Sequence, residues 1–127
     1  MTGRASTRGF TLIELLVVMS IIGLLLTLAV PRYFHTVERS RETLLKHDLA
    51  VLREAIDRYY GDRDEYPDAP QALVDRHYIR LVPIDPVTRS AETWQPIPSD
   101  DPDHPGMRDI RSGSPAKALD GSEFASW

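Results

Sequence analysis

The sequence predicts an α+β fold in which a long, kinked N-terminal helix, transmembrane in its first half, packs by its second half on a small antiparallel sheet. Three observations lead to this prediction: an apolar run at residues 10–30, helical apolar spacing after it, and a proline-rich remainder with short strand-like stretches. The length of 127 residues, with 42% hydrophobic and 27% charged residues, fits one small domain.

The composition excludes several kinds of protein. The chain has no cysteine, which rules out a disulfide framework, a thiolate zinc site and a cysteine nucleophile. Its net charge of −4 argues against binding to nucleic acid through a basic surface. We therefore expect no nucleic-acid partner.

The apolar run at residues 10–30 is long enough to cross a membrane. It holds 21 residues with one charge, Glu14, and as a helix it would extend about 31 Å, close to the ~30 Å thickness of the hydrocarbon layer. The preceding flank contains Arg4 and Arg8 and no acid, which predicts that this end stays in the cytoplasm. The run exceeds the ~7–15 apolar residues of a secretory signal, and no small-x-small cleavage site follows it.

Glu14 is a charged residue of a kind that membrane helices rarely contain. A carboxylate at this depth costs a few kcal/mol and is usually paired or functional. Cleavage between Gly9 and Phe10 would free an α-amine four residues before Glu14, on the same helix face. The alternative is a glutamate that extends to the lipid headgroups, and the glutamate alone leaves both hypotheses open.

The surrounding residues favour the first hypothesis. The stretch RGFTLIELL at residues 8–16 closely resembles the class III signal of type IV pilins and type II secretion pseudopilins. The resemblance implies that a prepilin peptidase cuts after Gly9 and methylates Phe10, that Glu14 takes part in assembly, and that Pro31 ends the membrane stretch. It also implies a pilin-like fold in the bacterial inner membrane, with the part beyond the membrane in the periplasm.

The boundaries that follow are a leader at 1–9, a transmembrane and assembly helix at 10–30, a helical continuation at 31–61, and a small α/β head at 62–127. Pro31 lacks a backbone donor and should kink the helix, and Gly61 should end it near Tyr60. The continuation carries an apolar stripe with three- and four-residue steps: Val37, Leu44, Leu45, Leu49, Leu52, Ile56 and Tyr59.

Beyond the helix, the sequence predicts short elements. Residues 71–77 favour a helix capped by Asp68, and residues 93–97 and 107–111 have the composition of strands. Residues 124–127 predict a last strand or a return of the chain to the core. A sheet this small requires packing against the helix stripe to be stable.

The head is similar to that of the G-type major pseudopilin of type II secretion. The similarity lies in Tyr66-Pro67, in Tyr78-Ile79, in the turn at residues 82–86, in Trp94 and in the tail at residues 109–127. The absence of cysteine supports it, because many pilus-forming pilins close this region with a disulfide.

The G-type resemblance implies that a calcium ion orders the C-terminal loop. Calcium takes six to eight oxygen ligands, for which Asp120 and Asp109 are the carboxylate candidates, with serines nearby. The loop departs from the family pattern, since residues 114–119 contain Lys117 and no acid. The alternative is that Asp120-Gly121 is a tight turn.

The sequence contains no catalytic pattern. Its four histidines lack metal-ligand spacing, and we find no nucleophile elbow and no glycine-rich phosphate loop. The resemblance to the G-type pseudopilin implies that the chain is a structural subunit of a periplasmic type II secretion pseudopilus, processed by prepilin peptidase and supporting protein export. Its partners would be copies of itself, prepilin peptidase, minor pseudopilins and the inner-membrane secretion platform. The alternatives are a type IV pilin subunit for motility, adhesion or DNA uptake, and a signal-anchored periplasmic binding domain that does not polymerise.

Overall fold

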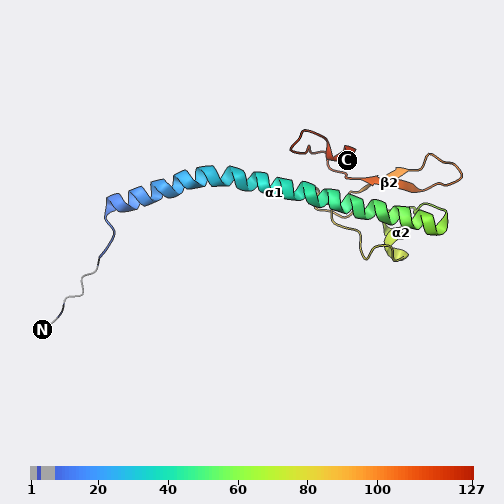
Figure 1. Ribbon diagram of the computed structural model, residues 1–127, viewed down its shortest axis with the longest axis horizontal. Helices are drawn as coiled ribbons and strands as arrows, with labels where there is room; N and C mark the ends of the chain where they lie inside the picture. The colour runs from blue at the N-terminus through green and yellow to red at the C-terminus, as the bar shows by residue number, and fades with distance from the viewer. Residues whose placement is uncertain (1–2, 4–7) are drawn as a thin grey trace. The chain divides into compact units, whose positions relative to one another are not determined.

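The structure is a computed structural model that describes residue 3 and residues 8–127, shown in Figure 1. Its compact units are Met1–Val37 and Glu38–Trp127, and each is described by itself. The predicted α+β class is confirmed. Its elements are helix α1 (Leu12–Arg63), helix α2 (Pro70–Asp75), strands β1 (Gln95–Pro98) and β2 (Met107–Arg111), and the 3-10 helix η1 (Phe124–Ser126).

In the first unit, the start of α1 exposes its apolar side chains on every face. Leu24, for example, is 65% exposed. The polar side chains are satisfied within the helix, because the hydroxyls of Ser20 and Thr27 donate to the carbonyls of Leu16 and Gly23. Among the described residues, α1 is the helix long and apolar enough to cross a membrane.

Helix α1 is continuous through Pro31. Because proline has no N–H, the carbonyl of Thr27 loses its usual helical donor there, and the kink stays a prediction. The predicted stop at Gly61 is wrong, since α1 continues to Arg63. A glycine in a helix costs only about 1 kcal/mol. The residue after the helix, Asp64, has a left-handed φ of 55°, and its N–H donates to the carbonyl of Tyr60 at 2.8 Å.

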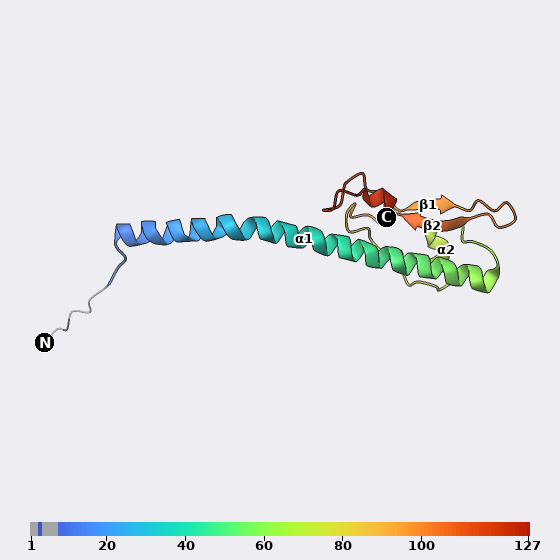
Figure 2. The same cartoon turned by 45° about the horizontal axis from the view of Figure 1, so that its top comes forward.

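In the second unit, the core forms along one stripe of α1. Figures 1 and 2 show the two strands beside the second half of this helix. The predicted stripe is largely confirmed, but Leu44 is 49% exposed while its neighbour Leu45 is fully buried. The buried residues from α1 are Leu45, Leu49, Leu52, Ala55, Ile56 and Tyr59, and they pack with Leu73, Trp94, Met107, Ile110, Ala118 and Phe124.

The sheet is a single antiparallel pair. Gln95 lies opposite Arg111 and Ile97 lies opposite Asp109, with an irregularity before Pro98. The second strand matches its prediction, whereas β1 begins two residues later than expected. Two strands are unstable alone, so the sheet depends on its packing against α1.

One other local prediction needs correction, and of the two alternatives for residues 124–127 the return to the core is confirmed. Helix α2 is capped at Ala69 without a side-chain hydrogen bond, so Asp68 is not its cap. Proline at Pro70 suits the first helical turn, because its missing N–H would be unpaired there in any case. The end of the chain forms η1 rather than a strand, and Phe124 returns to the core with 3% exposure.

The turn before β1 is held by a buried carboxylate. Asp85 is fully buried and accepts hydrogen bonds from the N–H groups of Val87 and Thr88 and from the hydroxyl of Ser112. These donors compensate the cost of burying the carboxylate. The contact with Ser112 ties this turn to the segment that follows β2.

Gly113 should be essential to the packing of the second unit. An added Cβ would lie 2.0 Å from the main-chain oxygen of Thr93, whereas at Gly61 it would meet nothing within 4 Å. Gly113→Ala should therefore destabilise the fold by about 1–3 kcal/mol or more. Gly61→Ala, the control, should be neutral or stabilising by up to ~1 kcal/mol. Denaturant unfolding of the two variants measures both effects, and equal stability would contradict the packing at Gly113.

Candidate assembly site at the start of the long helix

Glu14 lies in the first turn of α1 and takes part in a reciprocal cap with Thr11. The Glu14 N–H donates to the hydroxyl of Thr11 at 3.1 Å, and the Thr11 N–H donates to a carboxylate oxygen of Glu14 at 3.4 Å. This is a capping box, in which two side chains satisfy backbone donors at the helix start. The negative charge also suits the positive end of the helix dipole.

The surface around this carboxylate is apolar. Glu14 and Phe10 line a hollow of about 330 Å³, together with Ile13, Val17 and Val18. Phe10 is 86% exposed. Since Glu14 accepts the N–H of the residue directly after Phe10, its carboxylate is directed toward the place where cleavage would create an amine.

Gly9 is not required by the fold of the described residues. A Cβ added to it would meet nothing within 4 Å, and its φ is not in the left-handed region. If a glycine is needed at this position, a binding partner must impose the requirement.

The structure brings Phe10, Thr11 and Glu14 together and adds a role that our sequence analysis missed. The signal was present: Thr-x-x-Glu directly before an apolar run is the sequence pattern of a capping box. Glu14 therefore has a function within its own chain as well as any function between chains, and experiments must separate the two.

Comparison with known proteins agrees with this site. A family model described as the prokaryotic N-terminal methylation motif matches residues 4–30. Type II secretion system core protein G of Pseudomonas aeruginosa is 32% identical over 99 residues, which cover 65% of this chain and 70% of the relative. The chain belongs to the core protein G family. The matching protein of Klebsiella pneumoniae is 35% identical over 95 residues, covering 62% of this chain and 68% of the relative.

Other relatives match over a shorter part of their length. Core protein G of Klebsiella michiganensis is 37% identical over 70 residues, and the match covers 55% of this chain and about half, 49%, of that relative. The type IV major pilin protein PilA of Myxococcus xanthus is 39% identical over 61 residues, covering 48% of this chain and 28% of the pilin. No solved structure matches. The membrane-crossing helix and the core protein G relatives together indicate a membrane-anchored protein.

The two calcium candidates have other partners in this member of the family. Asp109 accepts a hydrogen bond from Arg53 at 2.8 Å, and Asp120 accepts two from Ser122, one from its N–H and one from its hydroxyl. Within residues 3 and 8–127, no group of three or more histidine, aspartate or glutamate side chains is placed to hold a metal ion. These residues do not fit a carboxylate-rich calcium site, and calcium binding stays a prediction.

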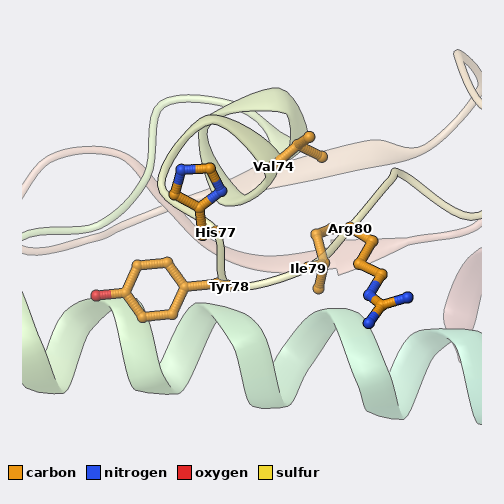
Figure 3. A pocket seen from close by; sticks show the side chains of 5 residues that line it. All are labelled: Val74, His77, Tyr78, Ile79 and Arg80. Atoms are coloured by element: carbon orange, nitrogen blue, oxygen red, sulfur yellow. The ribbon is translucent and has the colours of Figure 1, made fainter.

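A hollow of about 670 Å³ lies beside α2 and is lined by Val74, His77, Tyr78, Ile79 and Arg80 (Figure 3). The hydroxyl of Tyr78 donates to Asp62 at 2.8 Å, which raises the pKa of the Tyr78 phenol. These five lining residues include no paired nucleophile and base, so the hollow offers no catalytic arrangement.

His104 joins the loop between the strands to the end of α1. Its ring contacts Asp101 at 2.8 Å and Asp64 at 3.6 Å and meets the ring of Tyr60 edge-on at a centroid distance of 5.7 Å. The hydrogen bond with the Asp101 carboxylate raises the pKa of His104 and lowers that of Asp101.

These shifts predict a pH dependence of stability. Because the folded-state pKa of His104 is raised, its contribution is complete below the unfolded-state pKa of about 6.5 and is lost as pH rises through the folded-state value. The melting temperature of the wild type should exceed that of His104→Gln at about pH 5.5, and the difference should shrink by about pH 8.5. A difference that is constant or grows with pH would contradict the ionic contact.

Proposed function

We propose that this chain is a structural subunit of a type II secretion pseudopilus, cut after Gly9 by prepilin peptidase and methylated on Phe10. The observation that carries the proposal is the match of the methylation motif to residues 4–30, which include the capped and exposed apolar start of α1. The family relationship to core protein G supports the secretion system as its setting.

The apolar start of α1 has to be kept from water both before and after assembly. Large side chains from Leu12 to Val30 are 44–77% exposed, and burying each one is worth about 1.5–3 kcal/mol. Before assembly the inner membrane covers them, with the N-terminus in the cytoplasm and the second unit in the periplasm. In the filament, the same surfaces of neighbouring copies cover one another.

The charge of Glu14 determines the position that an incoming copy takes in the filament. After cleavage the amine of Phe10 is positive and the carboxylate of Glu14 is negative, and both enter an apolar environment during assembly. Their pairing compensates the cost of dehydration, whereas removing one partner leaves a buried charge that costs about 3–5 kcal/mol. The capping box keeps the carboxylate at the helix start, ready for the amine of the same or a neighbouring copy.

The subunit itself has a structural role and no catalytic one. Its partners are other copies of the chain, the peptidase, minor pseudopilins and the inner-membrane platform of the secretion system. Energy for assembly must come from another protein.

A type IV pilin subunit is the second candidate, favoured by the match to the Myxococcus xanthus pilin. That match covers 28% of the pilin, whereas the match to the Pseudomonas aeruginosa core protein G covers 70% of the relative. The greater coverage favours the secretion pseudopilus. Loss of protein export, rather than loss of motility, on deletion of the gene separates the two candidates.

Cleavage should depend on Gly9 and on no other glycine of the helix region. Gly9→Val should leave the uncut precursor in the membrane, because the peptidase cleft has to admit this backbone closely. Gly23→Val is the matched control, since a Cβ meets open space at both positions. Intact mass of membrane-extracted protein should show residues 10–127 with one added methyl group for the wild type and the control. Normal cleavage of Gly9→Val would contradict the proposal.

Assembly should depend on the charge of Glu14. Glutamine retains the hydrogen bonds of a capping box but has no charge. Glu14→Gln should therefore be inserted and cut normally, yet filament yield in a shearing assay should fall at least tenfold, because the Phe10 amine lacks its partner. Thr11→Val, the control, removes the cap but keeps the charge and should still assemble. Normal filaments from Glu14→Gln, or equal loss in both variants, would contradict the pairing.

A further inference from the structure

The C-terminal segment, residues 116–127, closes on itself through backbone hydrogen bonds. Lys117 and Glu123 form an antiparallel bridge. Three N–H groups donate across the turn: Ala118 to the carbonyl of Ser122 at 2.7 Å, Gly121 to that of Ala118 at 3.0 Å, and Phe124 to that of Ala116 at 3.3 Å. The bridge places a lysine opposite a glutamate, a favourable cross-strand pair.

Asp120 organises this turn from within. One of its carboxylate oxygens accepts the N–H of Ser122 at 2.9 Å and the hydroxyl of Ser122 at 2.6 Å, which lowers the pKa of Asp120. The same hydroxyl of Ser122 accepts the indole N–H of Trp127 at 2.8 Å. These contacts match the alternative to a calcium site that the sequence offered, a tight turn at Asp120-Gly121.

Helix α1 fastens the segment from outside with three charged side chains. Glu42 accepts the N–H of Leu119 at 2.5 Å, and the ammonium of Lys46 lies 4.8 Å from the centre of a Trp127 ring. Arg53 is the third, and its guanidinium donates to the main-chain oxygen of Trp127 at 2.6 Å. Each of the three belongs to the second unit.

The Arg53 guanidinium donates hydrogen bonds to three oxygens of the kind that a bound cation would coordinate. Besides Trp127, its guanidinium donates to the carboxylate of Asp109 at 2.8 Å and to the carbonyl of Ile110 at 3.1 Å. One positive charge therefore joins α1, β2 and the C-terminal segment through one side-chain carboxylate oxygen and two main-chain oxygens. These are the ligand types that calcium gathers from a loop, and a guanidinium holds them in fixed directions.

We infer that the Arg53 guanidinium, assisted by Glu42 and Lys46, orders the C-terminal segment in place of a calcium ion, so that the second unit closes without a divalent cation. The calcium expectation for the G-type family thus does not extend to this chain. The contacts that carry the inference lie within the second unit, so it holds whether or not the chain polymerises.

The test is thermal unfolding of the full-length chain in detergent, followed by tryptophan fluorescence, with excess calcium chloride or with EGTA. The wild type should melt at the same temperature in both buffers, because a ligand stabilises only a protein that binds it. A higher melting temperature in calcium that is lost in Asp120→Asn would overturn the inference.

Variants of Arg53 test directly whether its guanidinium takes the place of a calcium ion. Arg53→Lys keeps the charge but cannot reach three oxygens in fixed directions, and it should lower the melting temperature by about 4–8 °C, in calcium and in EGTA alike. Arg58→Lys is the matched control on the same helix, since Arg58 makes an exposed pair with Glu54, and it should change little. An Arg53→Lys variant as stable as the control would overturn the inference.

A second measurement covers the case in which Arg53→Lys fails to fold. Asp109→Asn removes the charge of the side chain that Arg53 contacts in β2, with little change of shape, and trypsin should then cleave after Lys117 several-fold faster than in the wild type. Unchanged trypsin cleavage at Lys117 would also contradict the assignment.

Discussion

The structure depends on one constraint: a single continuous helix has to satisfy two different environments. Over Leu12 to Val30 its apolar side chains are exposed on all faces, whereas from Leu45 to Tyr59 one stripe is buried against the rest of the second unit. Apart from the Thr27 carbonyl, which lacks its usual donor at Pro31, internal hydrogen bonds satisfy the backbone within the helix, so the change of environment is made by side chains. The first half therefore has to be covered by lipid or by other copies of the chain.

Charged side chains make the key polar contacts of this helix in two regions, its start and its second half. At its start, the Glu14 carboxylate caps the helix, and in the proposed assembly it is the partner of the Phe10 amine. In its second half, Arg53 fastens segments that have little regular structure of their own. The Arg53 guanidinium is hydrogen-bonded to three oxygens, which compensates its partial dehydration.

Features that depend on residues close together in the sequence were mostly predicted well. Features that depend on residues far apart in the sequence were not. The apolar run, the buried stripe and β2 follow from local periodicity. The capping box was readable from Thr11 and Glu14 but was overlooked. The stop at Gly61 failed because a glycine within a helix costs only about 1 kcal/mol. The cap at Asp68 failed because Pro70 takes the first helical position, which leaves Ala69 at the cap. The contacts of Arg53 were not predictable, since its partners lie 56 to 74 residues away along the chain.

In the proposed function, the membrane covers the first half of α1 before assembly. The natural chain lacks cysteine, so single variants Leu16→Cys, Leu24→Cys and Leu44→Cys can be labelled with a membrane-impermeant maleimide in spheroplasts that lack the secretion platform. The three leucines are 60%, 65% and 49% exposed in the isolated chain. We predict rapid labelling at position 44, and none at positions 16 and 24 until detergent is added. Labelling at position 24 as fast as at position 44 in intact membranes would contradict the account.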